Sequence, residues 1–176
     1  DIRPSRGLGD VYKRQGSYTG VFANANVGTG KTVNITPSYS GADVNNYSVT
    51  DQSTTTANIT AKALTATASA SNKTYDGGTT ASTTLTFTGL VGSETLGQTV
   101  GSTFDNKNVG AGKTVTVNSI TLADGSGLAA NYSISAGQTT TADITAKALT
   151  VSGITASNKM YDGNTVATLS SSNVTY

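Results

Sequence analysis

The chain contains no cysteine, no histidine and no tryptophan, and it has one methionine and two prolines. Without cysteine it forms no disulfides, which argues against a small disulfide-rich secreted domain. Without histidine and cysteine it lacks the ligands of common zinc, haem and thiol sites, and a Ser–His–Asp triad lacks its base. No apolar run approaches the roughly 20 residues that span a bilayer. We therefore expect no catalytic residue, no cofactor, no metal site and no membrane insertion within this segment.

Charged residues are also scarce, at 12% of 176 residues, and they are unevenly placed. All three arginines lie in residues 1–15. Outside that segment 7 basic residues accompany 8 acidic ones, so no basic patch remains to attract nucleic acid or anionic lipid. We therefore expect no nucleic acid among the partners of this chain.

What the chain has in abundance is repetition. Four blocks occur twice, in the same order, at offsets that run from 82 (Phe22 to Phe104) to 86 (Tyr75 to Tyr161). The paired blocks are residues 22–33 and 104–115, 46–49 and 131–134, 54–65 and 139–150, and 71–77 and 157–163. A period of this length is a small domain of its own, longer than one turn of a solenoid.

The offsets predict how the chain is divided. Residues 16–60 match the C-terminal half of a repeat, residues 61–145 form one complete repeat, and residues 146–176 begin a third. We therefore expect the chain to be a fragment of a longer tandem array. Residues 1–15 match nothing in the repeats, and their last residues resemble translated sequencing-adapter sequence. We predict a non-native segment there, and the alternative is a basic linker.

Within a repeat, apolar residues alternate with polar ones at period two, between turns rich in Gly, Asn and Asp. The alternating pairs are Leu85 and Phe87, Val115 and Val117, and Tyr132 and Ile134. Sustained helical periodicity is absent, and the stretch from Gly92 to Gly97 holds one short helical turn at most. The pattern predicts an all-β fold.

The segment that joins two repeats changes its apolar face. Ile144 lies at an even position and Leu149 at an odd one, and the first copy has Ile59 and Leu64 in the same phases. Because successive strand side chains point to opposite faces, the apolar face switches near Ala148. This pattern favours a strand-like connector, with Ile144 in the outgoing core and Leu149 in the incoming one. The alternative is a bulge within one domain.

Two glycine-rich stretches resemble ligand-binding loops only in part. Residues 28–32 and 110–114 resemble the end of a phosphate-binding loop, but Ala25 and Lys107 stand where that motif requires glycine. A glycine turn before a strand explains them. Asp124-Gly-Ser-Gly127 hints at a calcium loop but lacks the dense acidic spacing and the final glutamate of one.

A third glycine-containing motif, Tyr75-Asp76-Gly77, recurs as Tyr161-Asp162-Gly163. Asp-Gly is a turn signal, because the aspartate caps its own backbone and glycine tolerates positive φ. We predict that the tyrosine ring packs across the adjacent strand while its hydroxyl finds a partner. The alternative is a tyrosine that contacts a ligand.

Together these blocks carry a family resemblance. Asn-Lys-x-Tyr-Asp-Gly, Phe-x-x-x-Asn-Val-Gly-x-Gly-Lys-x-Val, Asn-Tyr-Ser and Ile-Thr-Ala-Lys-Ala-Leu-Thr resemble the YDG-type repeat domain of bacterial surface and secreted proteins, including adhesins similar to filamentous haemagglutinin. The resemblance implies extracellular all-β or β-grasp-like modules that act as a stalk or adhesive repeat. Together with the strand-like connector, it leads us to expect small β-sandwich or β-grasp-like modules arranged end to end. It supplies no catalytic residues. We expect structural roles for the motif residues Tyr75, Asp76, Gly77, Tyr161, Asp162, Gly163, Phe22, Phe104, Tyr47 and Tyr132.

From these observations we expect a structural or adhesive repeat region of a bacterial extracellular surface protein, acting as a stalk or spacer and in multivalent adhesion. Its partners would be the neighbouring repeats and a surface ligand, either a host protein or a glycan. One alternative is a specific glycan-binding module, which an exposed concave aromatic cluster would favour. A second alternative is a set of accessory repeats in a larger surface enzyme.

Overall fold

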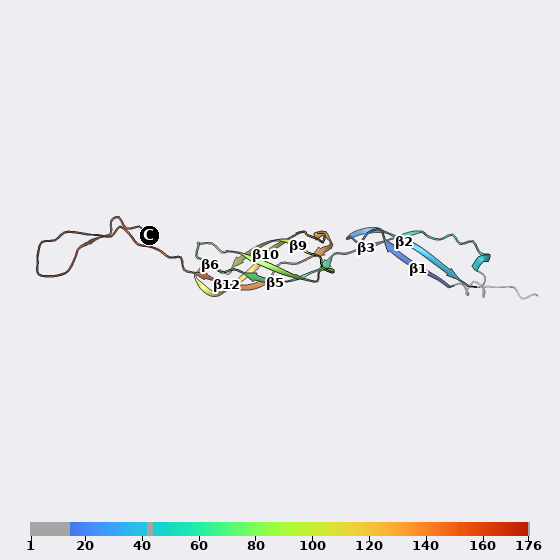
Figure 1. Ribbon diagram of the computed structural model, residues 1–176, viewed down its shortest axis with the longest axis horizontal. Helices are drawn as coiled ribbons and strands as arrows, with labels where there is room; N and C mark the ends of the chain where they lie inside the picture. Colours follow the sequence, from blue (N-terminus) through green and yellow to red (C-terminus); the bar gives the residue numbers. More distant parts are fainter. Residues whose placement is uncertain (1–14, 42–43, 176) are drawn as a thin grey trace, which may run out of the picture. The chain divides into compact units, whose positions relative to one another are not determined.

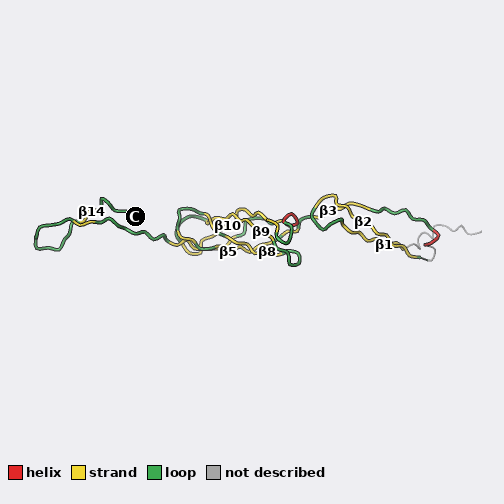
Figure 2. The backbone as a smooth tube through the Cα atoms, turned by 45° about the horizontal axis from the view of Figure 1, so that its top comes forward, coloured by secondary structure: helices red, strands yellow, loops and turns green. Residues whose placement is uncertain are grey.

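The computed structural model describes residues 15–41 and 44–175, and Figure 1 shows their course. The fold is all-β, as the alternating residues predict. Strands and loops make up the described part of the chain, together with two three-residue 3-10 turns, η2 (Val44–Asn46) and η3 (Ala129–Asn131) (Figure 2). The predicted non-native segment lies outside the described residues, except for Gln15, which pairs with Ser40. In the stretch from Gly92 to Gly97, Gly92 and Ser93 form a turn, with Gly92 at φ +55°, and a strand begins at Leu96.

The described chain divides into two compact units. The first consists of the residues up to Ala66 with residues 87–99 and 121–135. Its main sheet is antiparallel in the order β1-β2-β3, and a parallel pair, β4-β11, accompanies it. The strands are β1 (Gln15–Phe22), β2 (Gly28–Ser40), β3 (Thr54–Ile59), β4 (Lys62–Ala63) and β11 (Tyr132–Ser133).

The second unit consists of residues 67–86, 100–120 and those from Ala136 on. Residues 61–145 therefore contribute to both units. A five-stranded sheet runs in the order β6-β12-β10-β9-β7, and two-stranded pairs are formed by β5 with β8 and by β13 with β14. The strands are β5 (Thr65–Ala70), β6 (Lys73–Thr74), β7 (Thr80–Ala81), β8 (Thr83–Thr88), β9 (Leu96–Phe104), β10 (Gly110–Asp124), β12 (Thr139–Thr145), β13 (Thr155–Ala156) and β14 (Leu169–Ser170).

The core of the second unit follows the predicted alternation. Val115 and Val117 on β10 are 0% and 1% exposed, so they share the buried face that their spacing indicates. The buried cluster joins Val115 to three residues from β9 and β12, with the side chains of β5 and β7 packed against it. Its members are Phe104, Val115, Ala142 and Ile144, with Ala70 and Ala81 beside them.

The same face is less well covered in the first unit. Val33 and Ile35 on β2 occupy the positions of Val115 and Val117, one repeat earlier, and both are only half-buried. Identical local patterns therefore have different burial, because burial depends on the strands that lie across the sheet.

The burial predicted from the change of apolar face between repeats is found at some of the positions and not at others. Ile144 is buried in the core of the second unit, and Leu64 is buried in the first unit, where its N–H donates to the Ser133 carbonyl at 2.8 Å. The expectation that Leu149 is buried in an incoming core is wrong in this structure, since it is 70% exposed.

Candidate functional site

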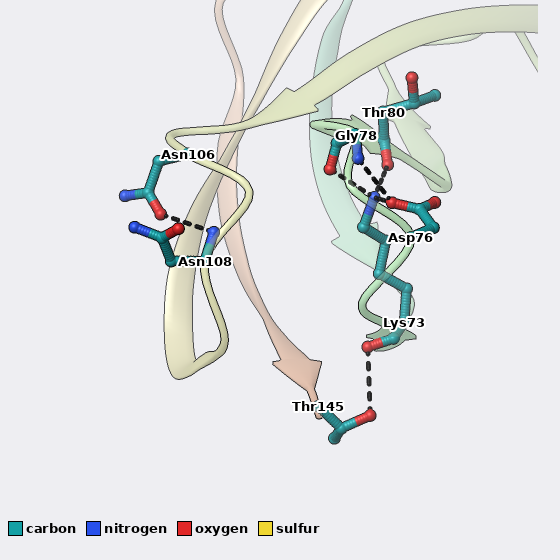
Figure 3. Close-up of polar contacts among 7 residues, drawn as sticks. All are labelled: Lys73, Asp76, Gly78, Thr80, Asn106, Asn108 and Thr145. Carbon is teal, nitrogen blue, oxygen red and sulfur yellow. Dashed lines mark hydrogen bonds and ion pairs between the residues drawn. The ribbon is translucent and has the colours of Figure 1, made fainter. Parts of the chain in front are cut away.

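The Tyr-Asp-Gly turn between β6 and β7 is built around a lysine. The Lys73 ammonium donates to Asp76 Oδ1 at 2.8 Å, and to the carbonyls of Gly78 and Thr80 at 2.9 and 3.1 Å (Figure 3). An ammonium group has three donors, so these contacts use all of them. Asp76 Oδ1 also accepts the Gly78 N–H at 2.9 Å, which confirms the predicted cap.

Two further contacts fasten this turn to the sheet. The Tyr75 N–H donates to the Thr145 carbonyl at 2.8 Å. The Thr145 hydroxyl donates to the Lys73 carbonyl at 3.3 Å (Figure 3). The Lys73 ammonium lies 5.6 Å from the centroid of the buried Phe104 ring, within the range of a cation–π interaction. The motif residues Lys73 and Phe104 thus connect the turn to the core.

The third repeat forms the same turn with different local residues. The Lys159 ammonium donates to Asp162 Oδ1 and to the Asn164 carbonyl, both at 2.9 Å. Asn164 stands where the second repeat has Gly78, and its N–H donates to Asp162 Oδ1 at 3.2 Å. The predicted positive φ is confirmed at both glycines, with +82° at Gly77 and +74° at Gly163.

The tyrosines of the two turns differ in exposure. Tyr75 is 36% exposed and Tyr161 is 98% exposed. For Tyr161 the predicted packing of the ring across a neighbouring strand is therefore wrong: its ring lies in solvent, in a stretch, residues 157–168, that contains no strand. The sequence analysis predicted a packing role for the tyrosine and no role for the lysine that holds the turn. The Lys-x-x-Asp spacing in both copies was the signal that could have identified it.

The ion pairs shift the acid–base equilibria of the aspartates. The hydrogen bond from Lys73 lowers the pKa of the Asp76 carboxyl below its usual value, and the Gly78 N–H acts in the same direction. Lys159 lowers the pKa of Asp162, and Lys113 lowers that of Asp105. These carboxylates are held in the charged form, as acceptors of fixed hydrogen bonds.

The loop that resembles a phosphate-binding loop is a hairpin fastened by its own lysine. The Lys113 ammonium lies 2.7 Å from Asn106 Oδ1 and 2.9 Å from Asp105 Oδ1. Asn106 Oδ1 also accepts the Asn108 N–H at 3.0 Å (Figure 3). The Gly112 N–H, at φ +59°, donates to Asp143 Oδ1 at 2.7 Å. The predicted glycine turn before a strand is thus corrected: Gly110 and Gly112 lie within β10, at a register shift, and the turn itself lies before them.

The first repeat builds the equivalent hairpin. The Lys31 ammonium donates to Asn24 Oδ1, and the Gly30 N–H, at φ +61°, donates to Asn58 Oδ1 at 2.8 Å. In both repeats a register shift follows the first residue of the long strand, Gly28 in β2 and Gly110 in β10. Phe22 precedes this hairpin and is half-buried, unlike its buried counterpart Phe104.

Tyr132, from the Asn-Tyr-Ser block, is buried in the first unit. Its hydroxyl accepts the Val91 N–H at 3.0 Å and donates to Glu94 Oε2. The hydrogen bond to Glu94 raises the pKa of the Tyr132 phenol above its usual value, because the carboxylate favours the neutral phenol. Tyr47, the same position one repeat earlier, is 43% exposed.

The residue before Tyr132 links two repeats inside the first unit. Asn131 Oδ1 accepts the Val27 N–H at 2.9 Å, and Asn131 Nδ2 donates to Asn26 Oδ1 at 3.2 Å. Asn26 and Val27 lie in the hairpin loop of the first repeat, and Asn131 ends η3 of the second. Sequence reasoning had no signal for this pairing, because the partners are 104 and 105 residues apart.

A cavity of about 520 Å³ lies on the sheet of the first unit. Tyr18 lies at its edge, and its ring meets that of Tyr39 edge to face at 6.1 Å. The Tyr39 hydroxyl donates to Asp51, which raises the pKa of Tyr39 well above its usual value, and the neighbouring Tyr18 hydroxyl adds to this. Val33 and Ile35 are among the residues that line the cavity. Since the corresponding valines of the second repeat are core residues, this cavity is an uncovered part of a core face.

The glycine-rich stretch that hinted at calcium is held by internal hydrogen bonds. Asp124 Oδ1 accepts the Ala129 N–H at 2.7 Å, and Ser126 Oγ accepts the Thr95 N–H at 2.8 Å. Within residues 15–41 and 44–175, no three acidic side chains are grouped so that they could hold a metal ion. Over the same described ranges, no helix is long and apolar enough to cross a membrane.

The fold and these turns define a class of protein: a tandem β repeat in which recurring lysine, asparagine and aspartate side chains fasten the loops. The family model of the YDG domain matches residues 7–57 and 60–142, so the chain belongs to the YDG domain family. The first matched range begins inside residues 1–15, and the exclusion of that segment stays a prediction. No match was found among curated proteins or among solved structures.

Proposed function

We propose that this chain is part of the structural repeat region of a bacterial extracellular surface protein, where the repeats act as a stalk or spacer and take part in multivalent adhesion. Membership of the YDG domain family supports this role. The recurring motif side chains support it as well, because they are engaged in fastening turns. The charged groups of Lys73, Asp76 and Lys113 form ion pairs and hydrogen bonds with residues of their own loop or hairpin.

The observation that carries the proposal is the short connection between the first two repeats. β3 ends at Ile59 and β4 begins at Lys62, so two residues lie between strands of successive repeats. Neither glycine nor proline occurs from Thr54 to Thr67. Such a connector has no residue suited to a loose hinge. Repeats joined in this way keep a defined spacing, and many copies would carry a binding tip outward or present weak sites together.

Small-angle scattering on a series of lengthened chains tests this role. Residues 1–145 would be followed by one, two or three further copies of residues 61–145, which preserves the Thr-Ala-Lys-Ala-Leu connection. We expect the maximum dimension to grow linearly with the number of copies. As a control, a Gly-Ser insertion before Ala61 at every junction, after Thr60 in the first and after Thr145 in the others, should make the growth sublinear. A compact profile for the uninserted series would contradict the stalk role.

The glycan-binding alternative is favoured by one observation, the Tyr18–Tyr39 ring pair beside the open cavity of the first unit. Aromatic rings at an open polar rim are a surface on which sugars stack. A screen with soluble oligosaccharides, followed by chemical-shift mapping, tests this candidate. Binding that Tyr18→Ala abolishes and Tyr161→Ala leaves intact would support it. Binding that is insensitive to Tyr18→Ala, or no binding at all, would exclude this cavity as a glycan site.

A further inference from the structure

The loop that contains Asn-Val-Gly occurs twice, at residues 26–28 and at residues 108–110. The two copies of this Asn-Val-Gly loop have the same local geometry but different surroundings. In both, a lysine ammonium donates to the asparagine two residues before the triplet, Asn24 or Asn106. The glycine two residues after the triplet has a positive φ, +61° at Gly30 and +59° at Gly112. Val27 in the first copy is half-buried, whereas its counterpart Val109 is 54% exposed. The loop itself cannot explain this difference, so the reason is what lies against it.

In the first copy, Asn131 of the following repeat lies against the loop. Its carboxamide acts in both directions, since Oδ1 accepts the Val27 N–H and Nδ2 donates to Asn26 Oδ1. A carboxamide supplies an acceptor and a donor side by side. Val27 and Asn131 also line a cavity of about 230 Å³, together with Ile59 of the connector and the buried Tyr132. The hydrogen bond of Val27 and the cavity that it lines thus involve the same short piece of the second repeat.

We propose that the Asn-Val-Gly loop of each repeat is the docking site for the Asn-Tyr turn of the repeat that follows. For the second repeat, this assigns the exposed loop at Asn108 and Val109 as an interaction surface. Its partner would be the Asn-Tyr-Ser turn of a further repeat of the same kind. The connector supports the assignment, because residues 60–65 return unchanged as residues 145–150 and would deliver the next repeat along the same path.

Amide hydrogen exchange in the chain as it stands tests the first half of this proposal. The Val27 amide should exchange more slowly than the Val109 amide. Asn131→Ala should raise the exchange rate at Val27 by about fivefold, the factor that one ordinary hydrogen bond contributes. The Gly30 amide, which is held by Asn58 of its own repeat, should not respond. Equal exchange at Val27 and Val109, or no response at Val27 to Asn131→Ala, would overturn the pairing.

Two variants separate loss of docking from loss of folding. Asn26→Ala removes one of the two hydrogen bonds from the side of the preceding repeat, and it leaves the residues of the second repeat unchanged. It should weaken the protection of Val27 without altering that of Val115, which is fully buried. Asn46→Ala changes the residue equivalent to Asn131 one repeat earlier, and it should leave Val27 unaffected.

A lengthened chain tests the second half. Residues 61–145 are added directly after Thr145 in place of residues 146–176. The Val109 amide should then gain protection similar to that of Val27, and Asn131→Ala in the added copy should remove it. If Val109 exchanges at the same rate with and without the added copy, while Val115 of that copy is protected, the proposal fails. This outcome concerns the docking pair alone, because the stalk role is tested separately by scattering.

Discussion

Gly77→Val tests the account of the Tyr-Asp-Gly turn most directly. Gly77 has φ +82°, and a Cβ added there would meet no atom within 4 Å. The cost of valine is therefore conformational and not a steric clash with neighbours. A positive φ costs an L-residue about 1–2 kcal/mol, and a β-branched side chain raises this toward about 3 kcal/mol. We expect the variant to lower the free energy of unfolding of the surrounding repeat by about 1–3 kcal/mol.

The adjacent glycine is the matched control. Gly78 has no positive φ, and an added Cβ would lie 3.5 Å from Asp76 Oδ1, which is ordinary contact. Gly78→Ala should leave stability unchanged or raise it by up to about 1 kcal/mol, because alanine restricts the unfolded chain. Urea unfolding, followed through the amide signals of Val115 and Val117, reports the second repeat alone. Equal stabilities of Gly77→Val and Gly78→Ala would refute the reasoning.

Three further predictions concern burial, charge and the tyrosine hydroxyl. Leu64→Ala should lower the free energy of unfolding by about 2–4 kcal/mol, because Leu64 is buried. Leu149→Ala should change it by no more than about 0.5 kcal/mol, because Leu149 is 70% exposed. Urea unfolding of the two variants checks this, and equal losses of stability would contradict it. The pKa of Asp76 and that of Asp105 are lowered on folding, so their contribution to stability is present above the ordinary pKa of about 3.9 and is lost as the pH falls through the lower folded-state values. Stability measured from pH 7 to pH 2 should therefore decline below pH ~4, and less so when either aspartate is replaced by asparagine. Tyr132→Phe removes a hydroxyl with two hydrogen bonds and should cost about 1–3 kcal/mol by urea unfolding; an unchanged midpoint would show that these bonds add nothing.

Several features of the fold follow from residues that are close together in the sequence. The alternation around Val115 and Val117 correctly predicted a strand with one buried face. The Asp-Gly pairs correctly predicted a capped turn with positive φ at Gly77 and Gly163. These features are local, because they depend on the pleat of one strand or on the φ that one residue can adopt. The absence of the required glycine at Ala25 and Lys107 argued against a phosphate-binding loop, but the glycines that follow lie within β2 and β10 and not in a turn before them.

The sequence by itself determined the repeat, the all-β class and the family, since all three depend on the order and spacing of residues. Only the tertiary structure decided which copy of each motif is buried. Val33 and Val115 occupy the same motif position, as do Leu64 and Leu149, yet within each pair one side chain is more deeply buried than the other. It also decided that Asn131 meets a loop 104 residues away. The physical reason is that burial and long-range hydrogen bonds depend on strands brought together by folding, and identical local sequences carry no information about which strands those are.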